Sequence, residues 1–245
     1  MPYRKIQFVN DEIYHIVVRA IDDNIMFKDI DDYYRGIFSI YEFNDSRSVT
    51  IRERRQERAK IKKELQKFVN ETTNRDRVSV DSRDKLVEIL TFSFMPNHPH
   101  LLLRQIQEEG IIKFMRKVGI GYAGYFNCKY NRKGYVFQSR FKAVHIETED
   151  QLKNVFVYIH TNPVALIEPN WKERGIGNPL KAIKFLENYK WSSYLDYIGK
   201  KNFPSVTERE FLSEVMGGEK GCQKFVNQWI KYKGEIATLG DIVLE

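Results

Sequence analysis

Apolar and polar positions along the chain follow two periods, and each period predicts one kind of element. Strands are predicted where β-branched and apolar residues are dense or alternate, and helices where apolar residues recur every three or four positions. In chain order the pattern gives a strand at 12–20, a helix at 31–43, strands at 85–95 and 99–105, a helix at 110–130 and a strand at 141–146. This order is that of the split βαβ arrangement. We therefore predict an α+β protein with a ferredoxin-like antiparallel sheet and helices on one face of it.

Two further segments lie outside this order of strands and helices. Residues 45–84 are dominated by the charged run RERRQERAKIKKELQKF, which predicts an exposed, inserted helix. Residues beyond about 200 carry spaced apolar side chains that predict a small C-terminal helical appendage. We therefore divide the chain into a domain at 1–200, with the insertion at about 45–84, and a helical extension at 201–245.

The predicted hairpin carries two histidines at the start of its second strand, just after the turn Pro96-Asn97. Successive side chains of a strand point to opposite faces, so His98 and His100 place both imidazoles on one face. Two neutral imidazoles can share one metal ion, although histidines in strands are more often structural. From the spacing alone both interpretations stay open.

A third helix is predicted to begin after Thr148, where Gln151 completes a candidate capping box, and to end at Pro163. Tyr158 and Asn162 are four residues apart, so a hydroxyl and an amide project together from one side of this helix. From helix position alone a packing role for Tyr158 is favoured. The pair is nevertheless a candidate functional unit.

Composition narrows the function classes without selecting one. The 245 residues include 40 Lys and Arg against 33 Asp and Glu, and the net charge of +7 suits a polyanionic partner without requiring one. The 2 cysteines, Cys128 and Cys222, indicate neither a disulfide framework nor a zinc knuckle. We expect no export signal and no membrane span, which makes the cytoplasm the expected compartment.

Two basic segments are candidate nucleic-acid contacts. In the inserted helix, Arg54 and Arg58 belong to a face of mixed charge, for which simple solvation and phosphate binding have comparable weight. The segment 129–142 (KYNRKGYVFQSRFK) interleaves basic and aromatic residues, the combination that follows a single strand by charge and stacking. Its candidate contacts are Arg132, Lys133, Arg140 and Lys142.

Five ordered segments of the chain resemble the HUH-type tyrosine transposases of insertion sequences, in particular the REP-associated tyrosine transposases. These segments are YHIVVRA at 14–20, MPNHPHLLL at 95–103, GYVFQSRFK at 134–142, YIHTNPV at 158–164 and WSSY at 191–194. The resemblance implies that His98 and His100 bind a divalent metal, Mg²⁺ or Mn²⁺, and that Tyr158 is the nucleophile. Asn162 matches a position that resembles the third metal ligand of the family.

The resemblance implies an enzyme that cuts and rejoins single-stranded DNA near hairpins through a covalent 5′-phosphotyrosine, leaving a free 3′-hydroxyl. The alternative is a domesticated relative, weakly active or inactive, that binds structured DNA or RNA. Two residues depart from the family pattern, since Pro99 replaces a bulky apolar residue and Ala165 a common arginine. A proline within a strand predicts locally altered sheet pairing. Relatives include monomers and dimers, so a homodimer stays open.

Overall fold

The computed structural model describes residues 6–50, 56, 81, 83–138, 140–169 and 171–231. The inserted charged segment, with Arg54 and Arg58, lies largely outside these residues, as does the end of the C-terminal tail. The described strands are β1 (Ile13–Val17), β2 (Val87–Met95), β3 (His98–Gln105) and β4 (Lys142–Ile146). The described helices are α1 (Ile30–Glu42), α3 (Gly110–Lys129), α4 (Glu149–Thr161), α5 (Trp171–Arg174), α6 (Pro179–Leu186), α7 (Tyr194–Tyr197), α8 (Glu210–Val215) and α9 (Gly218–Lys231), with short 3-10 helices η1 (Ile21–Asp23) and η2 (Asn162–Leu166).

The four described strands form one antiparallel sheet in the order β2-β3-β1-β4. The helices α1 and α3 connect β1 to β2 and β3 to β4, which is the split βαβ connection. The predicted α+β, ferredoxin-like fold class is therefore confirmed. The predicted turn Pro96-Asn97 also joins β2 to β3, because Met95 pairs directly with His98.

Sheet pairing around Pro99 is regular, so the predicted local disturbance at this residue is wrong. Pro99 pairs with Phe94 of β2, and the β1–β3 ladder begins one residue later, where His100 pairs with Val17. The Phe94 N–H points away from β3, since it donates to the carbonyl of Trp191 at 2.8 Å. The missing N–H of the proline therefore falls where neither neighbouring ladder needs a donor. The described irregularity of β2 lies at Ile89/Thr91 instead.

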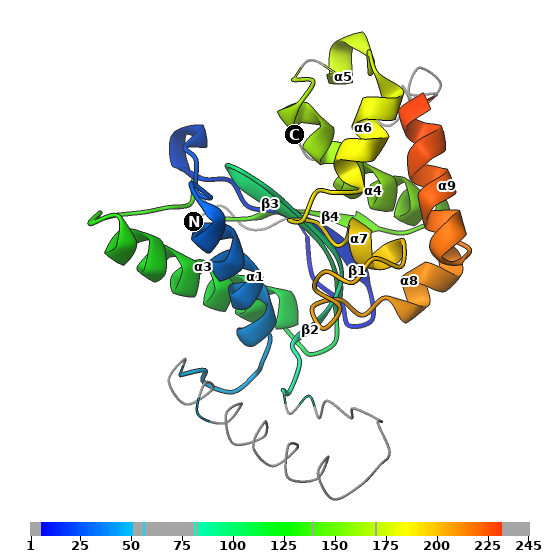
Figure 1. The fold of residues 1–245 in the computed structure, drawn as a ribbon. Helices are drawn as coiled ribbons and strands as arrows, with labels where there is room; N and C mark the ends of the chain where they lie inside the picture. The colour runs from blue at the N-terminus through cyan, green and yellow to red at the C-terminus, as the bar shows by residue number, and fades with distance from the viewer. Residues whose placement is uncertain are drawn as a thin grey trace, which may run out of the picture.

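The helices α1 and α3 cover one face of the sheet, as predicted (Figure 1). A cluster of buried aliphatic and aromatic side chains fills the layer between them and the strands, including Ile16, Phe92, Leu101, Ile37 and Phe114. Each fully buried side chain of this size contributes roughly 1.5–3 kcal/mol relative to exposure. The layer is closely packed at α1, where a Cβ on Gly36 would meet the Phe94 ring at 2.4 Å.

The start of α1 is fixed by a buried carboxylate. Asp32 completes a capping box with Asp29, and it also accepts hydrogen bonds from the Lys28 N–H at 2.9 Å, the Lys129 ammonium at 2.8 Å and the Tyr130 hydroxyl at 2.7 Å. Burial opposes ionisation, yet the hydrogen bonds from Lys129 and Tyr130 lower the pKa of Asp32 below its ordinary value. The cap thus also ties α1 to the C-terminal end of α3.

We expect Asp32→Asn to lower the free energy of unfolding by about 2–4 kcal/mol, because it removes a buried charge whose partners stay in place. Asp31 is the matched control, since it is exposed in the same helical turn. Asp31→Asn should cost less than about 1 kcal/mol through the helix dipole alone. Urea unfolding of the two variants measures the difference, and equal losses would show that the buried network does not stabilise α1.

A second helical layer covers the opposite face of the sheet (Figure 1). It contains α4 together with α6, α7, α8 and α9, and its core joins Leu102 of β3 and Phe156 of α4 to Leu212 and Val226 of the C-terminal segment. The prediction of helices on one face of the sheet alone is therefore wrong, because the two-helix pattern of a split βαβ unit does not include this layer. The second layer forms because β1 and β3 carry buried side chains on both faces of the sheet, so both faces must be covered. The predicted C-terminal helices therefore pack against the sheet domain.

The WSSY segment protects the free edge of β2. Ser192 forms an isolated antiparallel bridge with Ser93, and the Ser193 N–H donates to the carbonyl of Phe92 at 2.9 Å. An edge strand with unpaired backbone groups can pair with other chains, and the WSSY segment blocks this pairing at β2.

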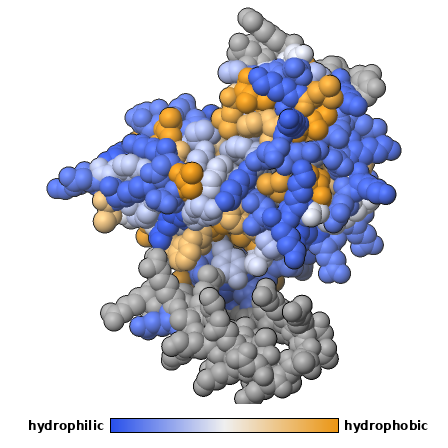
Figure 2. All heavy atoms as spheres, in the orientation of Figure 1, coloured by the Kyte–Doolittle hydropathy of each residue, from blue (hydrophilic) through white to orange (hydrophobic). Residues whose placement is uncertain are grey.

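The surface in Figure 2 is mostly hydrophilic, with apolar residues in small separate patches. No helix in the described part of the chain is long and apolar enough to span a membrane.

Candidate functional site

The histidine pair lies on the sheet face that α4 covers. His98 and His100 project from β3 to the same side, with ring centroids 4.8 Å apart, as their spacing predicts. His100 is 1% exposed, whereas His98 is only partly buried at the start of the strand. The pair therefore lies at the boundary between the core and the surface.

Residues Tyr158 and Asn162 approach His100 from the other side. The Tyr158 ring centroid lies 5.5 Å from that of His100, and the Asn162 Nδ2 lies 2.6 Å from the His100 Nε2. The predicted capping box of Thr148 and Gln151 is present and fixes the start of α4. Asn162 keeps helical angles, φ −51° and ψ −38°, although a proline follows it. This conformation holds its amide four residues beyond Tyr158 on the side that faces the sheet.

A third histidine completes the cluster. His15 of β1 is fully buried, and its Nε2 lies 3.0 Å from the Nδ1 of His100. No short-range sequence pattern indicates this contact, because the proximity of His15 to His100 depends on the β1–β3 register. In that register His15 pairs with Leu102, which places it diagonally next to His100 on the same face. The contact between His15 and His100 can be recognised only once the pairing of β1 with β3 is known.

Hydrogen bonds at Nδ1 orient the rings of both predicted metal ligands, His98 and His100. The His98 Nδ1 lies 2.6 Å from the Asn97 Oδ1, so it donates there and leaves Nε2 with the lone pair. The His100 Nδ1 faces His15, which leaves the His100 Nε2 facing Asn162. When the His100 proton is on Nδ1, His100 donates to the His15 Nε2. The His15 Nδ1 then has no hydrogen-bond partner among the described residues. Outer partners of this kind orient metal-binding histidines in proteins.

Burial keeps the imidazoles of this cluster neutral. Desolvation lowers the pKa of His98 to about 4, and the positive charges of Arg19 and Lys172 add to the effect. Desolvation also lowers the pKa of His100 well below its ordinary value, and the neighbouring His15 and His98 act in the same direction. A neutral imidazole is the form that binds a metal ion. The chemistry of the donor set, two imidazole Nε2 atoms and one side-chain amide, fits a divalent cation.

Within the described ranges, no group of three histidine, cysteine or carboxylate side chains is arranged to hold a metal ion. A site at the histidine pair therefore depends on the amide of Asn162 as its third protein ligand. The Asn162 amide now presents nitrogen to His100, and rotation by half a turn about its last bond would present the oxygen instead.

One cation close to Tyr158 was not foreseen. The Lys172 ammonium of α5 lies 5.6 Å from the centroid of the Tyr158 ring. Lys172 lies in the segment that follows Ala165. Trp171 packs edge-on against Trp229 of α9, with ring centroids 5.0 Å apart, and this contact holds α5 against α9. Tyr158 itself is 6% exposed. The α5 segment thus contributes a positive charge to a site that is nearly closed.

The four predicted basic contacts do not lie on one surface. Lys142 pairs with Val17 across β4 and β1, in the same row as His100, so it projects to the histidine face. Arg140 lines a cavity on the opposite face, Arg132 lies over the ring of Phe126 at 5.4 Å, and Lys133 is exposed. Of these four residues, Lys142 alone shares the face of the histidine pair.

The remaining histidines have structural contacts. His160 is fully buried, and its Nε2 lies 2.9 Å from the Ser193 hydroxyl, which ties α4 to the WSSY segment. His145 of β4 lies 2.8 Å from a carboxylate oxygen of Glu12 and stacks on Tyr14, on the opposite face of the sheet. Neither histidine therefore belongs to the His98–His100 cluster.

Comparison with known proteins finds one matching family. Residues 47–162 match the family described as transposase, IS200-like, and this span contains His98, His100, Tyr158 and Asn162. Over this span the chain is similar to the IS200-like transposases, the kind of protein that its motifs resemble. The chain is also similar to a solved structure of a REP-associated tyrosine transposase bound to a REP hairpin, with 14% identity and a TM-score of 0.49. That match covers 86% of this chain and 96% of the other. No curated protein matches the chain.

Proposed function

We propose that the protein is a metal-dependent transposase that cleaves and rejoins single-stranded DNA near hairpins through Tyr158. The observation that carries the proposal is the convergence of four predicted residues from two separate elements. The histidine pair of β3 meets Tyr158 of α4 and Asn162, the residue that caps the end of α4, on one face of the sheet. His100 and Asn162 are 62 positions apart in the chain. A purely structural role would not require this combination.

In the proposed reaction the Tyr158 oxygen attacks a phosphorus of the DNA backbone, and the bond between that phosphorus and the 3′ oxygen breaks. The phenol proton is lost, the departing 3′ oxygen gains a proton, and the 5′ side stays attached as a phosphotyrosine. Lys172 favours the charged phenolate and the phosphate, since its ammonium lies 5.6 Å from the ring centroid. The reverse attack by a 3′-hydroxyl would restore a phosphodiester and free Tyr158, so no external energy source is needed.

A divalent cation, Mg²⁺ or Mn²⁺, would be held by His98, His100 and Asn162. When bound there it would polarise a non-bridging phosphate oxygen as a Lewis acid. The chain itself orients these ligands, because Asn97 and His15 engage the two Nδ1 atoms and leave the Nε2 atoms of His98 and His100 for the ion. Lys142, on the same sheet face, would contact the backbone of the bound strand.

The burial of Tyr158 favours a second candidate, a nucleic-acid-binding relative with little or no activity. Tyr158 as a whole is 6% exposed, so a phosphodiester has little access to it unless neighbouring side chains move. In the first proposal, DNA binding displaces these side chains, whereas in the second they stay in place and the chain binds folded DNA or RNA without chemistry.

The two candidates differ in one product. The protein is incubated with Mn²⁺ and a set of labelled single-stranded hairpins, and denaturing gels are examined for labelled protein. A band that survives denaturation supports the transposase. Hairpins that bind in gel-shift assays but never give such a band would overturn it and support the binding module.

His15 gives a prediction that does not depend on turnover. We expect His15→Phe, which keeps the ring and removes the acceptor facing His100, to weaken Mn²⁺ binding by about 10- to 100-fold. His15→Gln, which restores a hydrogen-bonding group, should recover part of the loss. Isothermal titration calorimetry measures both, with thermal unfolding as the check on folding. Unchanged Mn²⁺ affinity in a folded His15→Phe variant would show that His15 merely fills space.

A further inference from the structure

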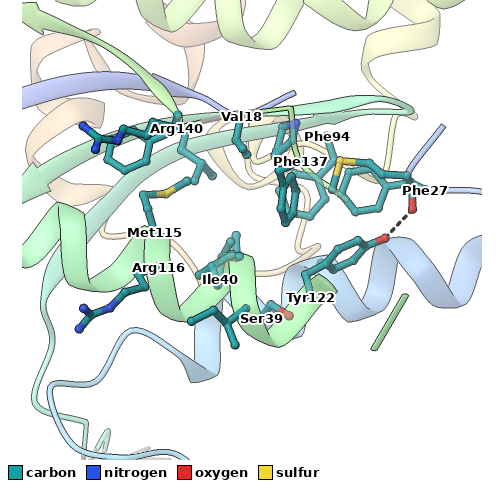
Figure 3. Close-up of a pocket in the computed structure, with 18 of the residues that line it drawn as sticks. Val18, Phe27, Ser39, Ile40, Phe94, Met115, Arg116, Tyr122, Phe137 and Arg140 are labelled. Carbon is teal, nitrogen blue, oxygen red and sulfur yellow. Dashed lines mark hydrogen bonds between the residues drawn. The ribbon is translucent and has the colours of Figure 1, made fainter. Parts of the chain in front are cut away.

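A cavity of about 550 Å³ lies on the other face of the sheet, between the strands and the helices α1 and α3 (Figure 3). Its volume falls within the range of small-molecule sites, roughly 300–1,000 Å³. Side chains of protein interiors normally leave few voids larger than a water molecule. A space of this size, open to solvent on one side, is therefore a candidate ligand site.

The interior of the cavity is apolar and its mouth is cationic. Phe94, Met115, Tyr122 and Phe137 line the interior, while Arg116 and Arg140 lie at one end on opposite walls, with their guanidinium groups pointing away from the interior (Figure 3). The Tyr122 hydroxyl is already engaged, because it donates to the carbonyl of Met26 at 2.6 Å. The wall of the cavity thus changes from aromatic to positively charged along its length.

The rim and one internal hydroxyl add to this picture. Ile112 and Ile120 of α3 line the cavity and are 39% and 69% exposed, which extends the apolar surface to solvent. The Ser39 hydroxyl of α1 also lines it, is fully buried and has no hydrogen-bond partner among the described residues. The interior of the cavity therefore offers very little hydrogen bonding to a ligand.

We propose that this cavity binds an anionic amphiphile, a single apolar chain that ends in one carboxylate. The chain occupies the aromatic interior, and the carboxylate stays at the mouth beside Arg116 and Arg140. An unstacked nucleobase fits less well, because its edge carries several donors and acceptors and the interior offers one unpaired group, Ser39. Pro99 also lines the cavity, so the ligand lies against the back of the strand that carries His98 and His100.

Binding is tested with octanoate, decanoate and dodecanoate in titration calorimetry on the full chain, without DNA or metal. We expect affinity to rise about fourfold per methylene, or about 15-fold per step of two, until the cavity is filled. Dodecanol should bind roughly two- to fivefold more weakly than dodecanoate, and Arg116→Gln should remove that preference. No binding, or no dependence on chain length, overturns the proposal.

A matched pair of glycines in α3 locates the ligand. A Cβ on Gly119, which lines the cavity, would meet the Phe137 ring at an ordinary 3.8 Å, so Gly119→Leu fills the space without a backbone clash. A Cβ on Gly124, in the same helix, would meet nothing within 4 Å. We expect Gly119→Leu to lose at least about tenfold in dodecanoate affinity and Gly124→Leu to lose none. Equal dodecanoate affinities in the two variants would contradict an amphiphile site in this cavity.

Discussion

Replacing Tyr158 by phenylalanine is expected to abolish the covalent protein–DNA adduct completely. The substitution removes one oxygen and keeps the ring, whose centroid lies 5.5 Å from that of His100 and 5.9 Å from that of His15. The packing of α4 on the sheet is therefore retained while the proposed nucleophile is lost. Binding of hairpin DNA should change little, because the phosphate contacts come from cations. Denaturing gels measure the adduct, and gel shifts measure binding.

The control for this experiment is Tyr194→Phe. Tyr194 is a buried tyrosine of the same helical layer, and its hydroxyl has no hydrogen-bond partner among the described residues. Removing that oxygen makes the same chemical change on a ring that packs near His160, 5.6 Å between centroids, so adduct formation should stay at the wild-type level. An adduct of wild-type yield in Tyr158→Phe would assign the attack to another residue.

The fold was largely predictable because its elements have strong local signals. The alternation of apolar residues in the strands, the Pro96-Asn97 turn and the capping box at Thr148 are all short-range features, and the structure contains each of them. The His98–His100 pairing on one face follows from strand geometry in the same way. The regular sheet at Pro99 was not predictable, because it depends on which side of β3 lacks a neighbouring ladder.

The parts of the site that sequence reasoning missed depend on contacts between distant segments. His15 reaches His100 through strand register, and Lys172 reaches Tyr158 because a Trp171–Trp229 contact holds α5 against the C-terminal helix. Neither contact has a short-range pattern. The second helical layer was missed for the same reason, since spaced apolar residues predict helices without saying which face they cover.

Replacing His100 by alanine is expected to weaken Mn²⁺ binding by at least about 100-fold, beyond the usual effect of losing an outer partner. His100 is the residue at which the whole cluster meets, since it contacts His15 through Nδ1 and Asn162 through Nε2. Its loss should remove one proposed ligand and leave the other two without a fixed geometry. Titration calorimetry with MnCl₂ measures the effect in the absence of DNA.

His145→Ala is the matched control, because His145 also belongs to the sheet but stacks on Tyr14 on the opposite face. It should bind Mn²⁺ as the wild type does. If both variants retain wild-type affinity while folded, the histidine pair is not a metal site and the proposed chemistry fails with it. If His100→Ala loses the metal and also the adduct, while Tyr158→Phe loses only the adduct, the two residues act in separate steps. Metal binding then belongs to β3 and nucleophilic attack to α4, the division of roles that their placement on opposite sides of the site implies.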